Sequence, residues 1–129
     1  MSWGSVTTSD TLDLTGSFQD FLVSSVTYEE TLNPGERAHV QLEYDPQASP
    51  TEHLEWAIFA TPDGTSYDAT PLHVGSVDKD LAAPNAISLI VEGVFGFKVA
   101  GRLVDPDGTD GGDDTAGAVL RVRKDGVNL

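Results

Sequence analysis

The chain has 129 residues and a formal net charge of −14, from 21 acidic against 7 basic side chains. This length suits one domain with a single core, and a hydrophobic content of 39% argues against a wholly disordered chain. The negative charge makes nucleic acid and anionic lipid unsuitable general partners. The absence of cysteine excludes disulfides and thiolate metal sites. Without an apolar run of roughly 20 residues or signal-peptide features, we expect no membrane partner and synthesis in the cytoplasm.

The first 17 residues are rich in Ser, Thr, Gly and Asp. This composition predicts an extended N-terminal arm over residues 1–17, followed by one domain over residues 18–129. The apolar residues of the arm are its candidate contacts with a partner or another subunit: Trp3, Val6, Leu12 and Leu14. Two interpretations of Trp3 remain open, because the ring either folds back onto its own domain or anchors on another subunit.

From residue 18 onward the hydrophobic period is two, which is typical of strands. Residues 37–44 place Ala38, Val40, Leu42 and Tyr44 on one face and polar side chains on the other, as a half-buried antiparallel strand requires. Residues 23–31 form the preceding strand. A turn with the pair Pro34-Gly35 separates the two strands, so they are expected to form a hairpin.

Further strands follow at turn-separated intervals. Residues 53–61 are expected to bury Leu54, Trp56, Ile58 and Ala60. Residues 67–77 form a weaker strand, interrupted at Pro71 and therefore expected at an edge or a bulge. Residues 86–92 and 94–104 form a second expected pair around Gly93, and residues 116–124 form a last strand. This pattern predicts an all-β fold, an antiparallel β-sandwich or jelly roll of about seven or eight strands.

The loop over residues 105–114 consists almost entirely of Asp, Gly, Thr and Pro. Its oxygen donors make Asp105, Asp107 and Asp110 candidate calcium ligands, and the alternative is a solvated loop held open by Gly and Asp. The acid spacing does not fit an EF-hand, and the three histidines are scattered. No motif pairs a nucleophile with a base. We therefore expect a protein that is not an enzyme and needs no cofactor.

Positive charge is concentrated near the C-terminal end of the chain. Five of the seven basic residues fall within the last 32 positions: Lys98, Arg102, Arg121, Arg123 and Lys124. The first four are on the outward parity of two strands. If these strands share a sheet, their side chains form a basic patch. Such a patch either neutralises outward acids such as Glu29 and Glu43 or docks on an acidic neighbour. Lys98, Arg102, Arg121 and Arg123 are thus further candidate contacts with an acidic neighbour or another subunit.

The sequence resembles a group of small structural proteins of tailed bacteriophages. The resemblance spans nearly the whole chain and rests on five segments: residues 1–5 (MSWGS), 32–41 (LNPGERAHVQ), 63–68 (DGTSYD), 87–93 (ISLIVEG) and 123–129 (RKDGVNL). These motifs are structural, so they indicate a virion component more strongly than one place in the virion.

Within this group, we expect a capsid cement or decoration protein on the capsid surface of the virion. The resemblance implies a homotrimer that binds the major capsid protein and stabilises the assembled shell. One alternative is a head-to-tail or tail-associated virion protein. Another is a carbohydrate-binding module, which would use exposed aromatic side chains such as Trp3, Phe59 and Tyr67.

Overall fold

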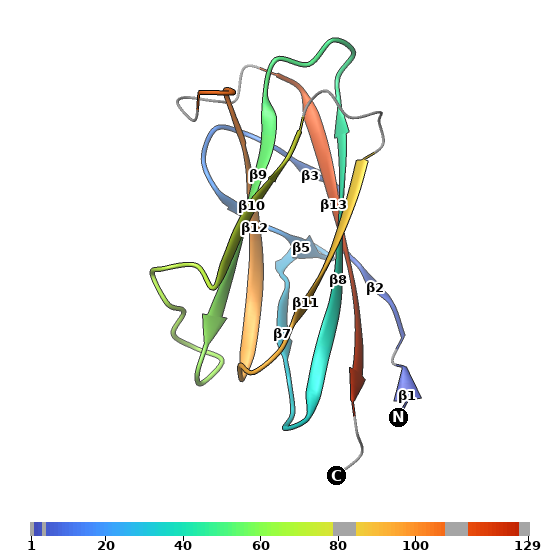
Figure 1. Cartoon of the computed structure of the whole chain (residues 1–129), viewed down its shortest axis with the longest axis vertical. Coiled ribbons are helices and arrows are strands. Elements are labelled where there is room, and N and C mark those ends of the chain that lie inside the picture. Colours follow the sequence, from blue (N-terminus) through green and yellow to red (C-terminus); the bar gives the residue numbers. More distant parts are fainter. Residues whose placement is uncertain (1, 4, 79–84, 108–113, 127–129) are drawn as a thin grey trace.

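The structure, a computed structural model, describes residues 2–3, 5–78, 85–107 and 114–126. Within these residues it is all-β, with two main antiparallel sheets packed face to face (Figure 1). The predicted all-β antiparallel sandwich is confirmed. Thirteen strand segments are present in this part of the chain, more than the seven or eight expected, because six of them are only two residues long. No helix in the described ranges is long and apolar enough to cross a membrane.

The six-stranded sheet is built around two long central strands, β8 (Glu36–Pro46) and β13 (Ala116–Gly126), which pair with each other. The seven-residue strand β11 (Asn85–Val91) pairs with the other side of β8 and forms one edge. The opposite edge consists of three short segments that pair with β13. These segments are β1 (Ser2–Trp3), β2 (Thr7–Thr8) and β3 (Leu12–Asp13).

The five-stranded sheet is centred on the pair β9 (His53–Thr61) and β12 (Gly96–Val104). The strand β10 (His73–Val77) pairs with β9 and forms one edge. Of the two positions expected after Pro71, an edge or a bulge, the structure has the edge. The other edge consists of β4 (Gln19–Asp20) and β7 (Glu29–Thr31), which both pair with β12. A separate small ladder joins β5 (Leu22–Val23) to β6 (Val26–Thr27).

Two expected hairpins are not formed, because both turns carry the chain from one sheet to the other. The turn at residues 33–36 closes as predicted, with the Glu36 N–H donating to the Asn33 carbonyl at 2.9 Å. However, β7 pairs with β12 whereas β8 pairs with β13 and β11. Likewise, β11 and β12 meet at Gly93, whose φ is +75°, but they belong to different sheets. Alternation specifies which face of a strand is buried and leaves its partner strand undetermined.

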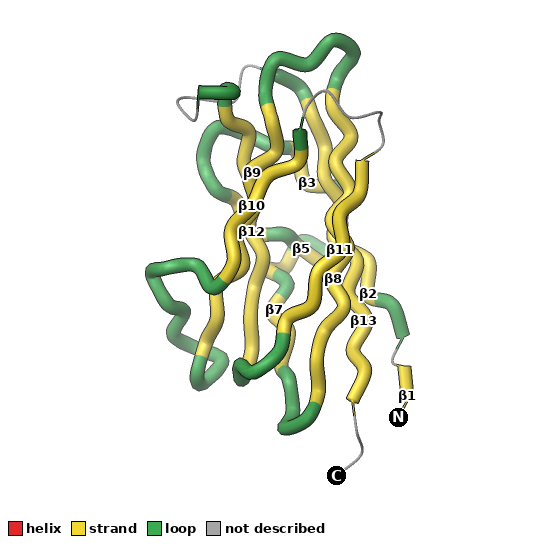
Figure 2. Tube along the Cα trace, viewed as in Figure 1, coloured by secondary structure: helices red, strands yellow, loops and turns green. Residues whose placement is uncertain are grey.

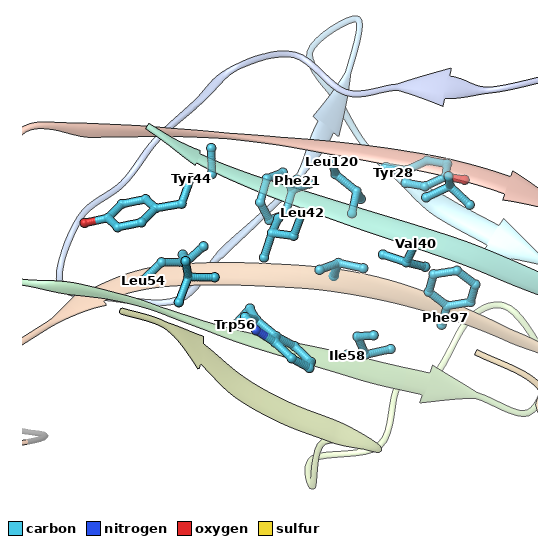
Figure 3. Packing of buried hydrophobic residues seen from close by; sticks show 14 of the residues in the cluster. Phe21, Tyr28, Val40, Leu42, Tyr44, Leu54, Trp56, Ile58, Phe97 and Leu120 are labelled. Atoms are coloured by element: carbon cyan, nitrogen blue, oxygen red, sulfur yellow. The ribbon is translucent and has the colours of Figure 1, made fainter. Parts of the chain in front are cut away.

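The core fills the space between the two inner sheet faces (Figure 3). All the side chains predicted to face inward on β8, β9 and β13 are buried: Ala38, Val40, Leu42, Tyr44, Leu54, Trp56, Ile58, Ala60, Ala118, Leu120 and Val122. The Trp56 ring lies so close to Gly75 of β10 that a Cβ atom there would be 2.4 Å from Trp56 Cζ2. The edge strand therefore needs a glycine opposite this tryptophan.

The N-terminal segment is part of the sandwich along much of its length. The Ser9 N–H donates to the Leu120 carbonyl, and the Leu120 N–H donates to Ser9 Oγ, both at 2.8 Å. Leu14 is buried with 6% exposure, and Leu12 packs against the core. The expectation that this segment lies outside the core is therefore wrong at Leu12 and Leu14. Their apolar side chains look isolated in a polar sequence, but in the fold they cover one edge of the core.

Candidate functional site

A groove of about 630 Å³ lies on the outer face of the six-stranded sheet. The outward side chains that line it are His39, Gln41, Ser88, Ile90, Arg121 and Arg123, with Val6 beside them. Val6 and Ile90 are the large apolar side chains among these and are 45% and 46% exposed. The groove therefore combines accessible apolar surface with fixed polar groups, the combination found at binding sites.

The register of three long strands brings these residues together. Side chains of one parity along β11, β8 and β13 point outward, because the other parity fills the core. Two rows run across the sheet in this register. One row contains Ser88, Gln41, Arg121 and Thr8, and the next contains Ile90, His39 and Arg123. The groove therefore forms only when these strands pair, because its residues are far apart in the chain. Gln41 and Arg121, for example, are 80 positions apart.

Charged partners hold the polar side chains of the groove in place. Arg121 Nη1 donates to Glu43 Oε1 at 3.1 Å and to Gln41 Oε1 at 3.3 Å. His39 Nε2 lies 3.0 Å from Asp125 Oδ2, whereas Arg37 Nε donates to Asp125 Oδ1 at 2.9 Å. The hydrogen bond from Arg37, followed by that from His39, lowers the pKa of Asp125 below its ordinary value. The side chains are thus oriented before any partner arrives.

The basic residues do not form one patch, because Lys98 and Arg102 lie on β12 in the five-stranded sheet, whereas Arg121 and Arg123 lie on β13. Lys98 Nζ lies 3.2 Å from Asp20 Oδ2. It also lies 4.8 Å from the centre of the Tyr67 ring.

Arg102 is held in a similar way. Its guanidinium lies 2.6 Å from Glu55 Oε1 and 4.4 Å from the Phe18 ring centre. One of the two interpretations of these cations was that neighbouring acids neutralise them. Lys98, Arg102 and Arg121 are each paired with an acidic side chain in this way. Glu43 is one of the acids expected in that role.

The four apolar arm residues are placed differently from one another. Val6 lines the groove, and Trp3 is opposite Asp125 in the pairing of β1 with β13. Leu12 packs against the core and Leu14 is buried within it. Neither side chain is fully available for contact with another molecule. Of the three arm residues whose side chains the structure describes, only Val6 joins Arg121 and Arg123 at the groove. Three of the eight predicted contacts are thus seen together there.

The predicted calcium ligands fall partly outside the described residues, where Asp110 lies. Asp105 directly follows β12 and is half-buried, and Asp107 is exposed. In the part of the chain that the structure describes, no three His, Cys, Asp or Glu side chains gather in a way that would hold a metal ion. The calcium hypothesis therefore gains no support from Asp105 and Asp107.

Sequence reasoning missed the β8 and β11 residues of the groove: His39, Gln41, Ser88 and Ile90. The outward direction of His39 and Gln41 was predicted, but the strands that pair with β8 were not. A usable signal was present in residues 85–91, NAISLIV, which contain no charged side chain in a chain that is 22% charged. The outward side chains of this strand, Ala86, Ser88 and Ile90, are therefore all uncharged.

The fold and the groove define a two-sheet antiparallel β-sandwich with a candidate binding surface on one outer face. No family model and no curated protein matches the chain. Among solved structures, the chain is similar to one described as "Bacillus endospore appendages form a novel family of disulfide-linked pili", with a TM-score of 0.55 and 12% identity. The alignment covers 98% of this chain and 88% of that chain. At this identity the likeness shows the fold alone.

Proposed function

We propose that the chain is a structural protein of a phage virion, a capsid cement or decoration protein that docks on the assembled shell through the groove. The observation that carries this proposal is the groove itself, where exposed Val6 and Ile90 flank oriented polar side chains. The resemblance to small structural proteins of tailed bacteriophages supports the choice of a virion. In this role the major capsid protein is the partner and the capsid surface is the location.

Paired charges around the groove support its use as a docking surface. Arg37 pairs with Asp125 and Arg121 with Glu43, whereas Arg123 is opposite His39 in the pairing of β13 with β8. The chain carries a net charge of −14. A partner can cover the groove without facing a surface of unpaired carboxylates. The apolar side chains supply most of the contact energy, and the polar rows supply register.

Co-sedimentation with empty shells tests the proposal. The shells are assembled from the major capsid protein encoded in the same genome as the chain. The variant Ile90→Asp places a charge on the apolar side of the groove and is expected to abolish co-sedimentation. The matched control is Val74→Asp, because Val74 is 64% exposed on β10 of the other sheet. Melting curves establish that both variants fold.

Binding by the wild type and Val74→Asp, with loss for Ile90→Asp alone, supports docking through the groove. Equal binding of both variants contradicts the groove as the docking surface. Failure of the wild type to bind shells contradicts the capsid role. Immunogold microscopy of virions then separates a shell position from a head-to-tail or tail position.

A second candidate function is the subunit of a protein fibre, and the fold similarity to the endospore pilus structure favours it. The present chain contains no cysteine, so its copies cannot be linked by disulfides and would associate through strands or faces. Electron microscopy of the concentrated protein tests this candidate. Regular filaments would favour a fibre subunit over a shell protein.

The carbohydrate-binding alternative depends on aromatic rings that a sugar can stack against. Lys98 Nζ lies 4.8 Å from the centre of the Tyr67 ring and 5.9 Å from that of Phe59. The ammonium group therefore occupies space over both rings, which disfavours stacking of a sugar on those faces. A glycan array with clear hits would restore this alternative.

A further inference from the structure

Two open strand edges lie on the same side of the sandwich (Figure 2). The strand β10 ends the five-stranded sheet and β11 ends the six-stranded sheet, and these two strands contact each other. Among the described residues, no further strand pairs with the outer edge of either one. An unpaired edge offers a row of backbone N–H and C=O groups that can pair with another chain.

The opposite side of the sandwich is protected in the usual way. Its edges consist of segments of two or three residues, which present short ladders only. They also carry acidic side chains, including Asp13, Asp20 and Glu29. Short strands and charges are the common devices that prevent strand addition. The strand β11 has neither device, since it is seven residues long and contains no charged side chain.

We propose that β11 pairs antiparallel with β11 of a second copy of this chain, about a two-fold axis at Ser88, so that the two six-stranded sheets become one. In this register Ser88 faces Ser88 of the second copy. The other pairs are Ile87 with Leu89, Ala86 with Ile90, and Asn85 with Val91. Each pair joins residues of the same parity, so outward side chains meet outward ones and inward side chains meet inward ones.

The charge of the chain argues for this edge in an association of two copies. Each copy carries −14, so most surfaces of one copy would place carboxylates against carboxylates of the other. The pairing of two β11 strands places no charge opposite another. Ala86 of each copy leaves space for the larger Ile90 of the other, and Ile90 is 46% exposed in the single chain. Pairing would therefore cover apolar surface as well as backbone groups.

The other open edge is less suited to the same pairing. The strand β10 has five residues, with Gly75 at its centre, and a central glycine provides no side chain to pack across strands. By contrast, Ser88 and Ile90 of β11 also line the groove. The paired sheets would therefore carry two grooves side by side on one continuous face. This inference does not depend on the capsid role.

Light scattering during size-exclusion chromatography tests the pairing with the full chain. The wild type is expected to elute at twice the mass of one chain. The variant Ser88→Lys places two ammonium groups opposite each other at the axis and is expected to elute as a single chain, as is Ser88→Glu. Because residue 88 faces itself, an equimolar mixture of the two variants should restore the double mass. Melting curves confirm that each variant is folded.

The matched control is Ser76→Lys, which places the same charge at an exposed position of β10. It is expected to leave the double mass unchanged. A wild type that elutes as a single chain at all concentrations, or as the trimer expected from the resemblance, overturns the proposal. Ser88→Lys at double mass overturns it as well, as does a mixture that stays monomeric. If a monomeric wild type still binds shells, the proposed β11 pairing is contradicted but the proposed capsid role is not.

Discussion

Glu52 and Asp114 exchange hydrogen bonds across the end of the sandwich, although they are 62 positions apart in the chain. The Glu52 N–H donates to Asp114 Oδ2 at 2.9 Å, and the Asp114 N–H donates to Glu52 Oε1 at 2.8 Å. Thr51 adds two more donors to the Asp114 carboxylate, its N–H at 2.7 Å and its Oγ1 at 2.8 Å. Glu52 is the residue before β9, and Asp114 is two residues before the start of β13. The cluster therefore joins the starts of two strands in different sheets.

The variant Asp114→Ala should destabilise the protein strongly. It leaves the buried Glu52 N–H without its acceptor, which costs about 1–3 kcal/mol for an unsatisfied buried group. The free energy of unfolding, measured by urea titration, should fall by at least this range. Asp45→Ala is the matched control, because it removes the same charge from an exposed position on β8. Equal stability of the two variants would contradict a structural role for the Asp114 cluster.

The contact between Gly75 and Trp56 predicts a steric effect. In Gly75→Ala the new methyl group would lie 2.4 Å from the Trp56 ring, so the ring or β10 must shift, at a cost of about 1–3 kcal/mol. Thermal unfolding followed by tryptophan fluorescence measures this change. The neighbouring exposed variant Ser76→Ala should have little effect. The cost of Gly75→Ala should shrink in a Trp56→Leu background, and a cost that is unchanged there would assign the strain to another contact.

The pairing of Asp125 with Arg37 and His39 predicts a pH dependence of stability. Because the pKa of Asp125 is lower in the folded protein than its ordinary value of 3.8, the carboxylate stabilises the fold above that value. This contribution is lost as the pH falls through the folded-state pKa. The variant Asp125→Asn should therefore melt at a lower temperature than the wild type at neutral pH, and the two curves should converge in acid. A constant difference at every pH would contradict this assignment.

The N-terminal segment predicts different outcomes for two truncations. Removal of residues 1–17 takes away buried Leu14, whose loss alone is comparable to a large core truncation of about 2–5 kcal/mol, and it uncovers the edge of β13. The shortened domain should unfold at a lower temperature or fail to fold. Removal of residues 1–5 keeps Val6, Ser9 and Leu14 and should preserve most of the stability. An equally stable 18–129 domain would show that this segment is a separate arm.

Much of the fold was predictable from hydrophobic alternation. Residues 37–44 and 53–61 were expected as strands with their inward side chains specified, and the structure confirms both within β8 and β9. Pro71 indicated an edge or a bulge, and β10 lies at an edge. These features are local, because a period of two and the backbone restrictions of Pro and Gly act over a few residues.

The partners of the strands were decided only by tertiary structure. Neighbouring strands with matching alternation suggested hairpins at Pro34-Gly35 and Gly93, but both turns cross between sheets. The same ambiguity hid the groove, since Arg121 and His39 become neighbours only when β13 pairs with β8. It also made Leu14 look exposed.

The sequence by itself determined the all-β class, the inward side chains of β8, β9 and β13 and the overall negative charge of this protein. The three-dimensional fold decided which strands pair, which cations have acidic neighbours and which edges stay open. The physical reason is that alternation defines the two faces of a strand, whereas pairing depends on packing between segments far apart in the chain.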